Sequence, residues 1–493
     1  MPADLSASST KQRTPTVIRL LVLATFTVIL NETIMINAIP RLMNDLHVTE
    51  RSAQWVSTVF MLTMAAVIPV TGWFLQRVST RRAYAIAMGV FLVGTALAAV
   101  APSFAVLLIA RVIQAGGTAV MMPLLMTTLM TVVPEQDRGR VMGNVTLAIS
   151  VAPAMGPVIS GAVLNYGSWR WLFVLVLPIA GAVTVFGLRN LENVGEPQAG
   201  SIDWFSVVFA GFGFGGLVYG LSKFGSGSIA TPALFVVGGL ALVAIFVVRQ
   251  ISLQRNGTPL LDLRVLLSGT YAKALVLMAV AFLAMMGSMI LLPLYLQTLR
   301  ELTPLQTGLL VMPGGLAMGL LGPTVGKVFD RFGGRVLVIP GSIGITAALV
   351  GFTQISLTTP YAALVALHIL LMVSLAAAFT PVFTLGLGAL PMHLYSHGSS
   401  MLGTLQQVAA AFGTALVITV MTSRATHLVD GGENPLEAHL DGMRLAFLVS
   451  AALALIVIVM AVLLPNRSDA PAHGEQIPDT LDELDDAPQL VKD

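Results

Sequence analysis

The amino-acid sequence predicts an all-α membrane protein with 14 transmembrane helices. Of its 493 residues, 56% are hydrophobic and only 10% are charged, whereas soluble domains carry about 25% charged residues. Apolar blocks of about 20 residues recur from end to end, and each is long enough to cross roughly 30 Å of hydrocarbon as a helix. Helices are the expected element because lipid offers no hydrogen-bond partner to an exposed backbone amide.

The apolar blocks define the spans in order. They cover residues 17–40, 53–75, 83–101, 104–132, 141–165, 170–189, 204–222, 230–249, 272–297, 305–328, 336–356, 361–390, 398–422 and 443–464. The seventh block is rich in glycine, so a re-entrant or interfacial helix is an alternative there. The tail, residues 466–493, is acidic, contains proline and is expected to be disordered.

Lys and Arg are distributed unequally between the two sides of this topology. An even number of spans places both termini on one side. Of the 26 Lys and Arg residues, 18 fall on that side and seven on the other, and the one left over, Arg111, lies within a span. Because cytoplasmic loops are enriched in Lys and Arg, we expect a multi-pass protein of the cell (inner or plasma) membrane with both termini in the cytoplasm.

Composition and motifs exclude several classes of function. A net charge of +2 gives no basic surface for nucleic acid, and the lack of cysteine excludes disulfides, thiolate catalysis and Cys-based metal sites. There is no Gly-rich phosphate loop followed by Lys-Ser/Thr and no His/Glu metal pair within a span. We therefore expect neither an enzyme nor an ATP-driven pump, and no cofactor or metal. No signal-peptide cleavage site precedes Pro40, so the first span is expected to remain in the mature protein.

Two loops on the side of the termini match each other at an interval of 254 residues. The matched residues are Gly72, Gln76, Arg77 and Arg81 in the first loop and Gly326, Asp330, Arg331 and Arg335 in the second. The match favours two homologous six-helix bundles, residues 1–190 and 266–465, joined by a linker, 191–265, that contributes two extra transmembrane helices. Coincidence among Gly and Arg loop residues is the alternative. Parallel repeats of this kind are a transporter arrangement.

Three segments resemble signatures of the major facilitator superfamily. Residues 72–81 resemble its loop signature, residues 111–117 its fourth-helix motif, and residues 152–161 the fifth-helix motif of its antiporters. With 14 spans and the run Asn31-Glu32-Thr33-Ile34 in the first span, the chain resembles the 14-span drug:proton antiporters of the lincomycin-resistance type. This resemblance implies a monomer with a central cavity lined by the first, fourth and twelfth helices.

Two charged side chains lie away from the ends of the predicted spans, Glu32 and Arg111. A charge at the centre of a membrane costs about 2.5–3.5 kcal/mol on insertion scales, so such residues are functional candidates. If the first span ends near Pro40, Glu32 and Arg111 both lie roughly 12 Å below the outer boundary. His368 lies at a similar depth. The resemblance implies that Glu32 carries the transported proton and that Arg111 holds its deprotonated form, whereas a static ion pair between two helices is the alternative.

One departure from the resembled family concerns the position of the carboxylate. Many 14-span relatives begin this motif with aspartate, where this chain has Asn31. The carboxylate is displaced by one residue, about 100° around a helix. Further polar groups could offer hydrogen bonds to a substrate or could simply bridge helices. The candidates for the substrate cavity are Asn31, Asn37, Gln114, Gln297, His368 and Gln406. For His368 a packed position between helices is the favoured interpretation.

The repeated loops and the fifth-helix motif are expected to control conformation. Gly156 and Pro157 permit a kink and a close helix approach, and the flanking Ala152, Ser160 and Gly161 form a small-residue face. The resemblance implies that this segment seals the bundle. An ordinary proline kink is the alternative. The loop at 72–81 should act as a latch through Arg77 and Arg81. Its usual aspartate is Gln76, so it should hold more weakly than the second copy, which has Asp330.

The sequence therefore predicts a proton-coupled antiporter that exports lipophilic, amphipathic or cationic drugs by rocking two bundles about a central cavity. Its partners would be protons, drugs and membrane lipids. A first alternative is a dedicated exporter of one metabolite, lipid or amino acid. A second, from another class, is a membrane scaffold or sensor that transports nothing, although linker and tail contain no recognisable effector domain.

Overall fold

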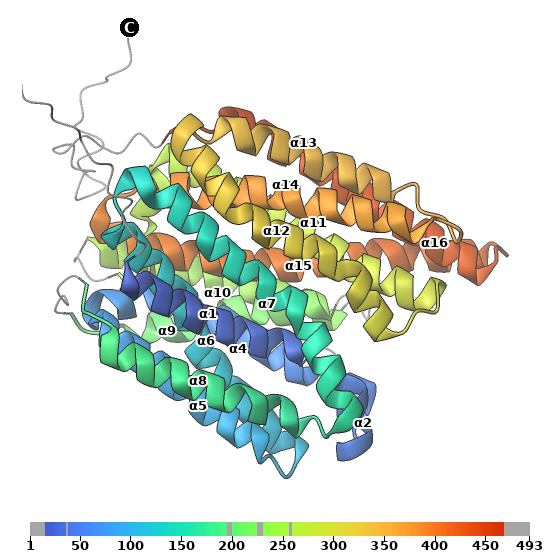
Figure 1. Cartoon of the computed structure of the whole chain (residues 1–493), viewed down its shortest axis with the longest axis horizontal. Coiled ribbons are helices and arrows are strands. Elements are labelled where there is room, and N and C mark those ends of the chain that lie inside the picture. The colour runs from blue at the N-terminus through green and yellow to red at the C-terminus, as the bar shows by residue number, and fades with distance from the viewer. Residues whose placement is uncertain (1–14, 36–37, 195–199, 224–229, 256–258, 468–493) are drawn as a thin grey trace, which may run out of the picture.

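The computed structural model describes residues 15–35, 38–194, 200–223, 230–255 and 259–467. Within these residues, 14 helices are long and apolar enough to cross a membrane, which confirms the predicted fold class (Figure 1). They are α1 (Thr16–Ile34), α4 (Trp55–Arg77), α5 (Thr80–Ala99), α6 (Phe104–Val132), α7 (Arg138–Tyr166), α8 (Arg170–Asn190), α9 (Trp204–Ser222), α10 (Ala230–Gln254), α11 (Gly269–Leu294), α12 (Pro304–Phe332), α13 (Arg335–Phe352), α14 (Tyr361–Gly388), α15 (Tyr395–Asp430) and α16 (Pro435–Leu463).

Short helices connect these spans. They are α2 (Ile39–Leu46) and α3 (Glu50–Ala53) between α1 and α4, the 3-10 turns Glu135–Asp137, Leu263–Leu267 and Met392–Leu394, and a π-helical turn, Tyr295–Leu299, that prolongs α11. The described ends of the chain, residues 15 and 467, lie on the left in Figure 1, and we call this side the terminus face and the opposite side the far face.

The end of α1 differs from the prediction. The helix ends at Ile34 rather than near Pro40, and Pro40 lies in the first turn of α2 instead. Proline is tolerated in a first helical turn because its missing N–H would have no partner there. Glu32 is therefore two residues from the end of its helix, not eight.

The last two spans are longer than predicted. α15 has 36 residues and α16 has 29, and both extend past the other helices at the far face (Figure 1). Arg424 of α15 and Asp441 of α16 form an ion pair of 3.2 Å in the extension. Their charge places these turns outside an apolar block, so hydropathy does not detect them.

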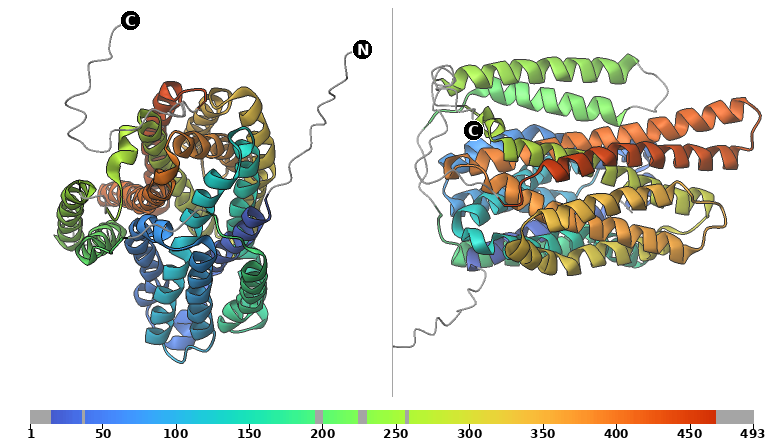
Figure 2. Two further views of the ribbon diagram at one scale, coloured as in Figure 1. Left: turned by 90° about the vertical axis from the view of Figure 1, so that its left-hand side faces the viewer. Right: turned by 90° about the horizontal axis from the view of Figure 1, so that it is seen from above.

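The spans pack in two groups of six. In the first group α5 packs on α6 and α8, α4 packs on α6, and α1 packs on α6, α7 and α8. In the second group, α11 to α16, α13 packs on α14 and α16, and α11 packs on α14, α15 and α16. The hairpin of α9 and α10 lies beside both groups (Figure 2). α9 is a continuous helix that packs on α4 and α15, whereas α10 packs mainly on α9.

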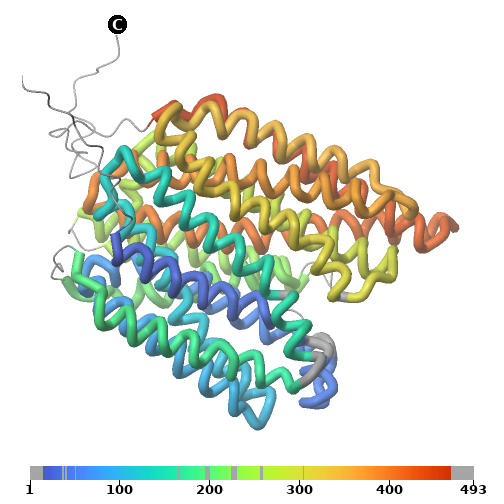
Figure 3. Tube along the Cα trace, viewed as in Figure 1, coloured from blue at the N-terminus to red at the C-terminus, as the bar shows by residue number. Residues whose placement is uncertain are grey.

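The most extensive contact between the two groups is that of α7 with α12, which run side by side (Figure 3). Glycines make this approach possible. A Cβ added to Gly143 would lie 2.2 Å from the carbonyl oxygen of Gly322, and a Cβ added to Gly326 would lie 2.1 Å from that of Gly139. In both helices these glycines recur at four-residue spacing, the small-xxx-small pattern of closely packed membrane helices.

Hydrogen bonds between the groups, in the part of the chain that the structure describes, lie in the half of the protein nearer the terminus face. Three of them join hydroxyl pairs: Thr71–Ser400 at 2.7 Å, Thr127–Ser399 at 2.9 Å and Thr146–Thr380 at 2.9 Å. Arg138 adds a hydrogen bond of 3.3 Å to the hydroxyl of Tyr395. The structure is thus a conformer in which the two groups are joined at the terminus face.

Candidate functional site within the membrane

Arg111 forms the centre of a polar cluster in the first group. It lies on α6 and is only 1% exposed. Its Nη1 donates to Gln114 Oε1 at 3.0 Å and to Asn31 Oδ1 at 3.3 Å, and its Nε donates to the Val56 carbonyl at 3.3 Å. The guanidinium also lies 4.1 Å from the ring centroid of Phe60. Neutral oxygens and an aromatic face therefore stabilise this buried cation.

Asn31 and Glu32 present different surroundings although they are adjacent on α1. Asn31 is fully buried and accepts from Arg111, while its Nδ2 has no hydrogen-bond partner among the described residues. Glu32 is half-buried and interacts electrostatically with Arg111. Glu32 makes no hydrogen bond or ion pair to any residue that the structure describes. Glu32 and Arg111 thus interact electrostatically, but the hydrogen bond of Arg111 goes to Asn31.

Gln114 bridges two helices. It is fully buried, accepts from Arg111, and donates through Nε2 to Thr95 Oγ1 on α5 at 2.8 Å. A Cβ added to Gly94 would lie 2.6 Å from the Gln114 backbone nitrogen, so α5 and α6 are in close contact here. Both the oxygen and the nitrogen of the side-chain amide are engaged by these bonds, which favours the helix-bridging role over contact with a substrate.

His368 is a packed histidine of the second group. It lies on α14, is 3% exposed, and hydrogen bonds to the backbone of Val311 on α12. A Cβ added to Gly314 would lie 2.3 Å from His368 Cδ2, so the ring fills the space beside that glycine. Its Nδ1 has no partner among the described residues. His368 belongs to the α12–α14 interface.

The remaining cavity candidates are scattered. Gln406 lies half-buried on α15 and makes no hydrogen bond to the described part of the chain. Gln297 is exposed in the π-helical turn that follows α11. Asn37 lies outside the described residues. Of the remaining candidates that the structure describes, Gln406 is the one with a half-buried amide that makes no hydrogen bond.

Thr33 is a residue of this site that the sequence reasoning overlooked. A Cβ added to Gly156 of α7 would lie 2.4 Å from Thr33 Oγ1, and that hydroxyl lies 3.5 Å from the Ala152 carbonyl. The fifth-helix motif thus packs on the residue that follows Glu32, and α7 continues without interruption through 156–157. A Cβ added to Gly161 would make only ordinary contact, 3.7 Å, with Leu305.

The two matched segments lie mostly in the last turns of α4 and α12 rather than in loops, and they make equivalent contacts with the opposite group. Asp330 accepts backbone N–H bonds from Gly139 at 2.8 Å and Arg140 at 2.7 Å, at the start of α7. Gln76 donates to the His393 carbonyl at 2.8 Å, just before α15. His393 follows Gly139 by the same 254 residues that separate Gln76 from Asp330. We call these two contacts the Asp330 latch and the Gln76 latch.

The glycines and arginines of the loops have separate roles. A Cβ added to Gly72 would lie 2.8 Å from His397 Nδ1, so this glycine, like Gly326, permits contact between the groups. The hydrogen bonds and ring contacts of the arginines go to their own group or to the linker, and Arg77 also interacts electrostatically with His397 of α15. Arg77 lies over Trp73, the backbone N–H of Arg81 donates to Asn193, Arg331 lies over Phe332, and Arg335 donates to the Leu464 carbonyl.

Comparison with known proteins adds to this geometry. A family model described as "Major Facilitator Superfamily" matches residues 21–414. The chain is 38% identical to the uncharacterized MFS-type transporter YcnB of Bacillus subtilis, over 93% of this chain and 96% of that protein. It is 36% identical to the lincomycin resistance protein LmrB of Listeria monocytogenes, over 81% of this chain and 85% of that protein.

Solved structures show the same fold. The human organic anion transporter MFSD10 superposes with a TM-score of 0.62 at 15% identity, and the match covers 91% of this chain and 100% of that chain. The proton:xylose symporter XylE superposes with a TM-score of 0.61 at 14% identity, over 92% of this chain and 96% of that chain.

Proposed function

The chain belongs to the major facilitator superfamily of transporters, and from that premise we propose that it is a proton-coupled antiporter that exports lipophilic or amphipathic drugs, cationic ones included. Relatives named for lincomycin resistance, and a multidrug resistance protein B homolog of Mycobacterium tuberculosis at 29% identity, support a drug as the substrate. We further propose that the protein works as a monomer in the cell membrane, with the terminus face in the cytoplasm.

The proton-coupling proposal rests on one observation: Asn31 accepts a hydrogen bond from Arg111, whereas the adjacent Glu32 makes no hydrogen bond within the described chain. Arg111 is held by Asn31, Gln114 and the Val56 carbonyl, so it keeps its position whether or not Glu32 is charged. Glu32 is half-buried and lacks a fixed hydrogen bond within the described chain, so it can gain or lose a proton without breaking the cluster. Deprotonated Glu32 is attracted to Arg111, and protonation cancels that attraction.

Alternating access follows from the two helix groups, which we propose to be homologous bundles. In this conformer the bundles are joined at the terminus face by the hydroxyl pairs and both latches. Drug and proton would exchange at the far face, and breaking these contacts would expose Glu32 to the cytoplasm. In the two arrangements of the bundles, Glu32 is then accessible from opposite sides of the membrane.

Exchange in liposomes tests the proposal. A Glu32→Gln variant should still bind drug. Its rate of proton-driven export should fall at least about tenfold, because the amide cannot release a proton. The matched control is Glu301→Gln, the same substitution at an exposed carboxylate beyond α11, which should export like wild type. Undiminished export by Glu32→Gln would remove Glu32 from the coupling role.

The substrate range needs a separate measurement. Competition by a panel of structurally unrelated drugs supports multidrug export. Competition by a single metabolite, lipid or amino acid supports the dedicated exporter instead, and absence of transport for every compound supports the scaffold or sensor.

A further inference from the structure

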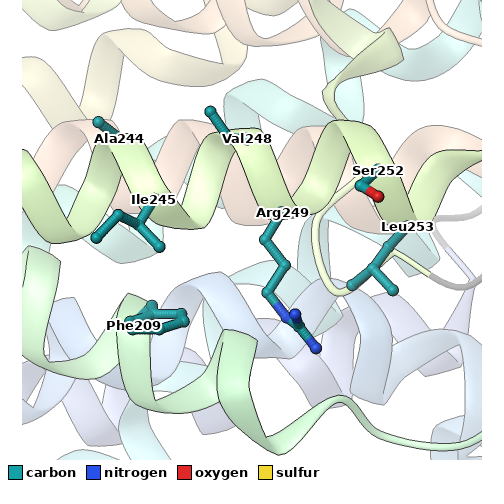
Figure 4. Close-up of a pocket in the computed structure, with 7 residues that line it drawn as sticks. All are labelled: Phe209, Ala244, Ile245, Val248, Arg249, Ser252 and Leu253. Carbon is teal, nitrogen blue, oxygen red and sulfur yellow. The ribbon is translucent and has the colours of Figure 1, made fainter.

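A groove lies on the surface of the α9–α10 hairpin (Figure 4). It has a volume of about 480 Å³, and it is lined by Phe209 of α9 and by Ala244, Ile245, Val248, Arg249, Ser252 and Leu253 of α10. Ile245 and Val248 are 47% and 68% exposed. These residues belong to a hairpin whose outer helix packs mainly on α9, so the apolar part of the groove faces lipid.

The groove has one charged side chain, and its position is rigidly set. Arg249 donates to both carboxylate oxygens of Asp203, through Nε at 2.6 Å and Nη2 at 2.7 Å. Asp203 in turn caps the start of α9 by accepting from the Ser206 backbone at 3.2 Å. Figure 4 shows Arg249 pointing from α10 toward the segment that leads into α9. The Nη1 group of Arg249 makes no hydrogen bond within the described chain, and the side chain is 37% exposed.

The part of α10 that carries Arg249 is also fixed by hydrogen bonds of the next residue, Gln250. The neighbouring Gln250 is fully buried, donates to Ser206 Oγ at 2.7 Å, and accepts from the backbone of Leu260 at 2.7 Å and Leu261 at 3.2 Å. These bonds tie α9, α10 and the segment that leads to α11 together. A ligand on Arg249 therefore meets a preformed site rather than a mobile side chain.

Aromatic side chains place Arg249 at the level of the lipid headgroups. Trp204 and Phe205, at the start of α9, are 68% and 67% exposed, and the Arg249 guanidinium lies 5.3 Å from the Phe205 ring centroid. Exposed aromatic residues at helix ends mark the membrane interface. Arg249 is also five residues from the end of α10, about 7.5 Å along the helix.

We propose that this groove binds a phospholipid of the leaflet at the terminus face. Its phosphodiester would accept from Arg249 Nη1 and from the hydroxyl of Ser252, which is exposed and one turn further toward that face. One acyl chain would lie along Phe209, Ile245 and Val248. A cationic side chain at the headgroup level beside an apolar track is the combination that a phospholipid complements.

Matched variants test the proposal in the purified full-length protein. Native mass spectrometry would measure the affinity of the first bound dioleoylphosphatidylglycerol. Arg249→Gln and Asp203→Asn both break the same ion pair, but only the first removes the phosphate donor. We expect Arg249→Gln to weaken this first affinity by about tenfold. Asp203→Asn should weaken it less, because the guanidinium remains and loses only its fixed position. Ala244→Phe, which fills the groove without touching the ion pair, should weaken it as well.

Competition experiments distinguish binding of a whole phospholipid from binding of its acyl chains or its phosphate alone. Dioleoylglycerol lacks the phosphate and inorganic phosphate lacks the chains, so neither should displace the lipid at equal concentration. Displacement by dioleoylglycerol would make the groove a general apolar surface, and displacement by inorganic phosphate would make it a simple anion site. Equal weakening by Arg249→Gln and Asp203→Asn, or none by Arg249→Gln, would also overturn the proposal.

Discussion

Arg111 shows how a single buried charge is accommodated in this protein. A guanidinium inside a membrane bundle must have its donors satisfied, because an unpaired buried charge is costly. Here the acceptors are two side-chain amides and a backbone carbonyl, and none of them titrates. Asn31 therefore supplies a neutral hydrogen-bond acceptor to Arg111 in the place of a carboxylate. This leaves the adjacent Glu32 free for proton exchange in the proposed mechanism.

Replacement of Asn31 tests this structural role. Asn31→Leu would remove one of the acceptors of buried Arg111, and we expect a loss of about 1–3 kcal/mol in the free energy of unfolding. Thermal unfolding of the detergent-solubilised protein would measure it. Gln406→Leu is the matched control, because it is the same kind of change at a half-buried amide without a hydrogen bond in the described chain. Equal stability of the two variants would contradict the role assigned to Asn31.

The two latches lie at matched positions but differ in the strength of their contacts. Both join the end of a second helix in one group to the segment that opens a helix of the other, at positions 254 residues apart. The Asp330 latch brings a carboxylate to the N-terminus of α7, where backbone N–H groups and the helix dipole favour negative charge. The Gln76 latch is one neutral hydrogen bond at an exposed site. The Asp330 latch should therefore contribute more to closure.

Single-cysteine labelling compares the latches. The chain has no cysteine, so Thr146→Cys introduces a unique reporter at the contact of α7 with Thr380. Asp330→Asn should increase its labelling rate by up to about fivefold, since loss of a negative charge at a helix N-terminus costs about 0.3–1 kcal/mol. Gln76→Ala should have a smaller effect. The reverse order would show that the charge at Asp330 does not hold the terminus face closed.

The α9–α10 hairpin depends on an ion pair at its base. Hydrogen bonds from Arg249 lower the pKa of Asp203 from its ordinary 3.8 to about 2, and those from Ser206 add to the effect. A carboxylate whose pKa is lower in the folded protein than in the unfolded chain stabilises the fold above the unfolded pKa. That stabilisation is lost as the pH falls from about 4 to about 2.

The pH dependence of stability tests this ion pair. Asp203→Asn should lower the free energy of unfolding by about 1–2 kcal/mol at neutral pH, after allowance for the partial exposure of Arg249. The difference from wild type should stay constant down to about pH 4 and shrink toward pH 2. Thermal unfolding at a series of pH values would measure it. A difference that grows on acidification would refute this assignment.

For the whole molecule, the proposed orientation in the membrane rests on the distribution of Lys and Arg. The terminus side carries 18 Lys and Arg residues and the far side seven. Two exposed glutamates, Glu192 and Glu433, lie on opposite faces and offer equivalent reporter positions. In intact cells an impermeant maleimide should label Glu433→Cys at once and Glu192→Cys only after lysis. The opposite pattern would place the termini outside.

Prediction of the elements succeeded where the signal is local. The span at 104–132 and the Gly-rich span at 204–222 coincide with α6 and α9, because a run of apolar residues bounded by polar ones depends on sequence alone. Prediction failed at the end of α1, where Pro40 opens the next helix instead of ending the first. It also failed at α15 and α16, whose charged ends are stabilised by partner helices through Arg424 and Asp441. Such ends require tertiary contacts that hydropathy does not contain.

The sequence by itself determined the number of spans and the membrane setting, because lipid forces backbone hydrogen bonds into helices. It also singled out Glu32 and Arg111 as charges within the spans, since such charges are costly there. Only the tertiary structure decided that Arg111 bonds to Asn31 rather than to Glu32, that Gly156 packs on Thr33, and that the two latches join opposite groups. A rotation of about 100° separates neighbouring side chains on a helix. Which of two adjacent residues meets a partner is therefore settled by how whole helices pack.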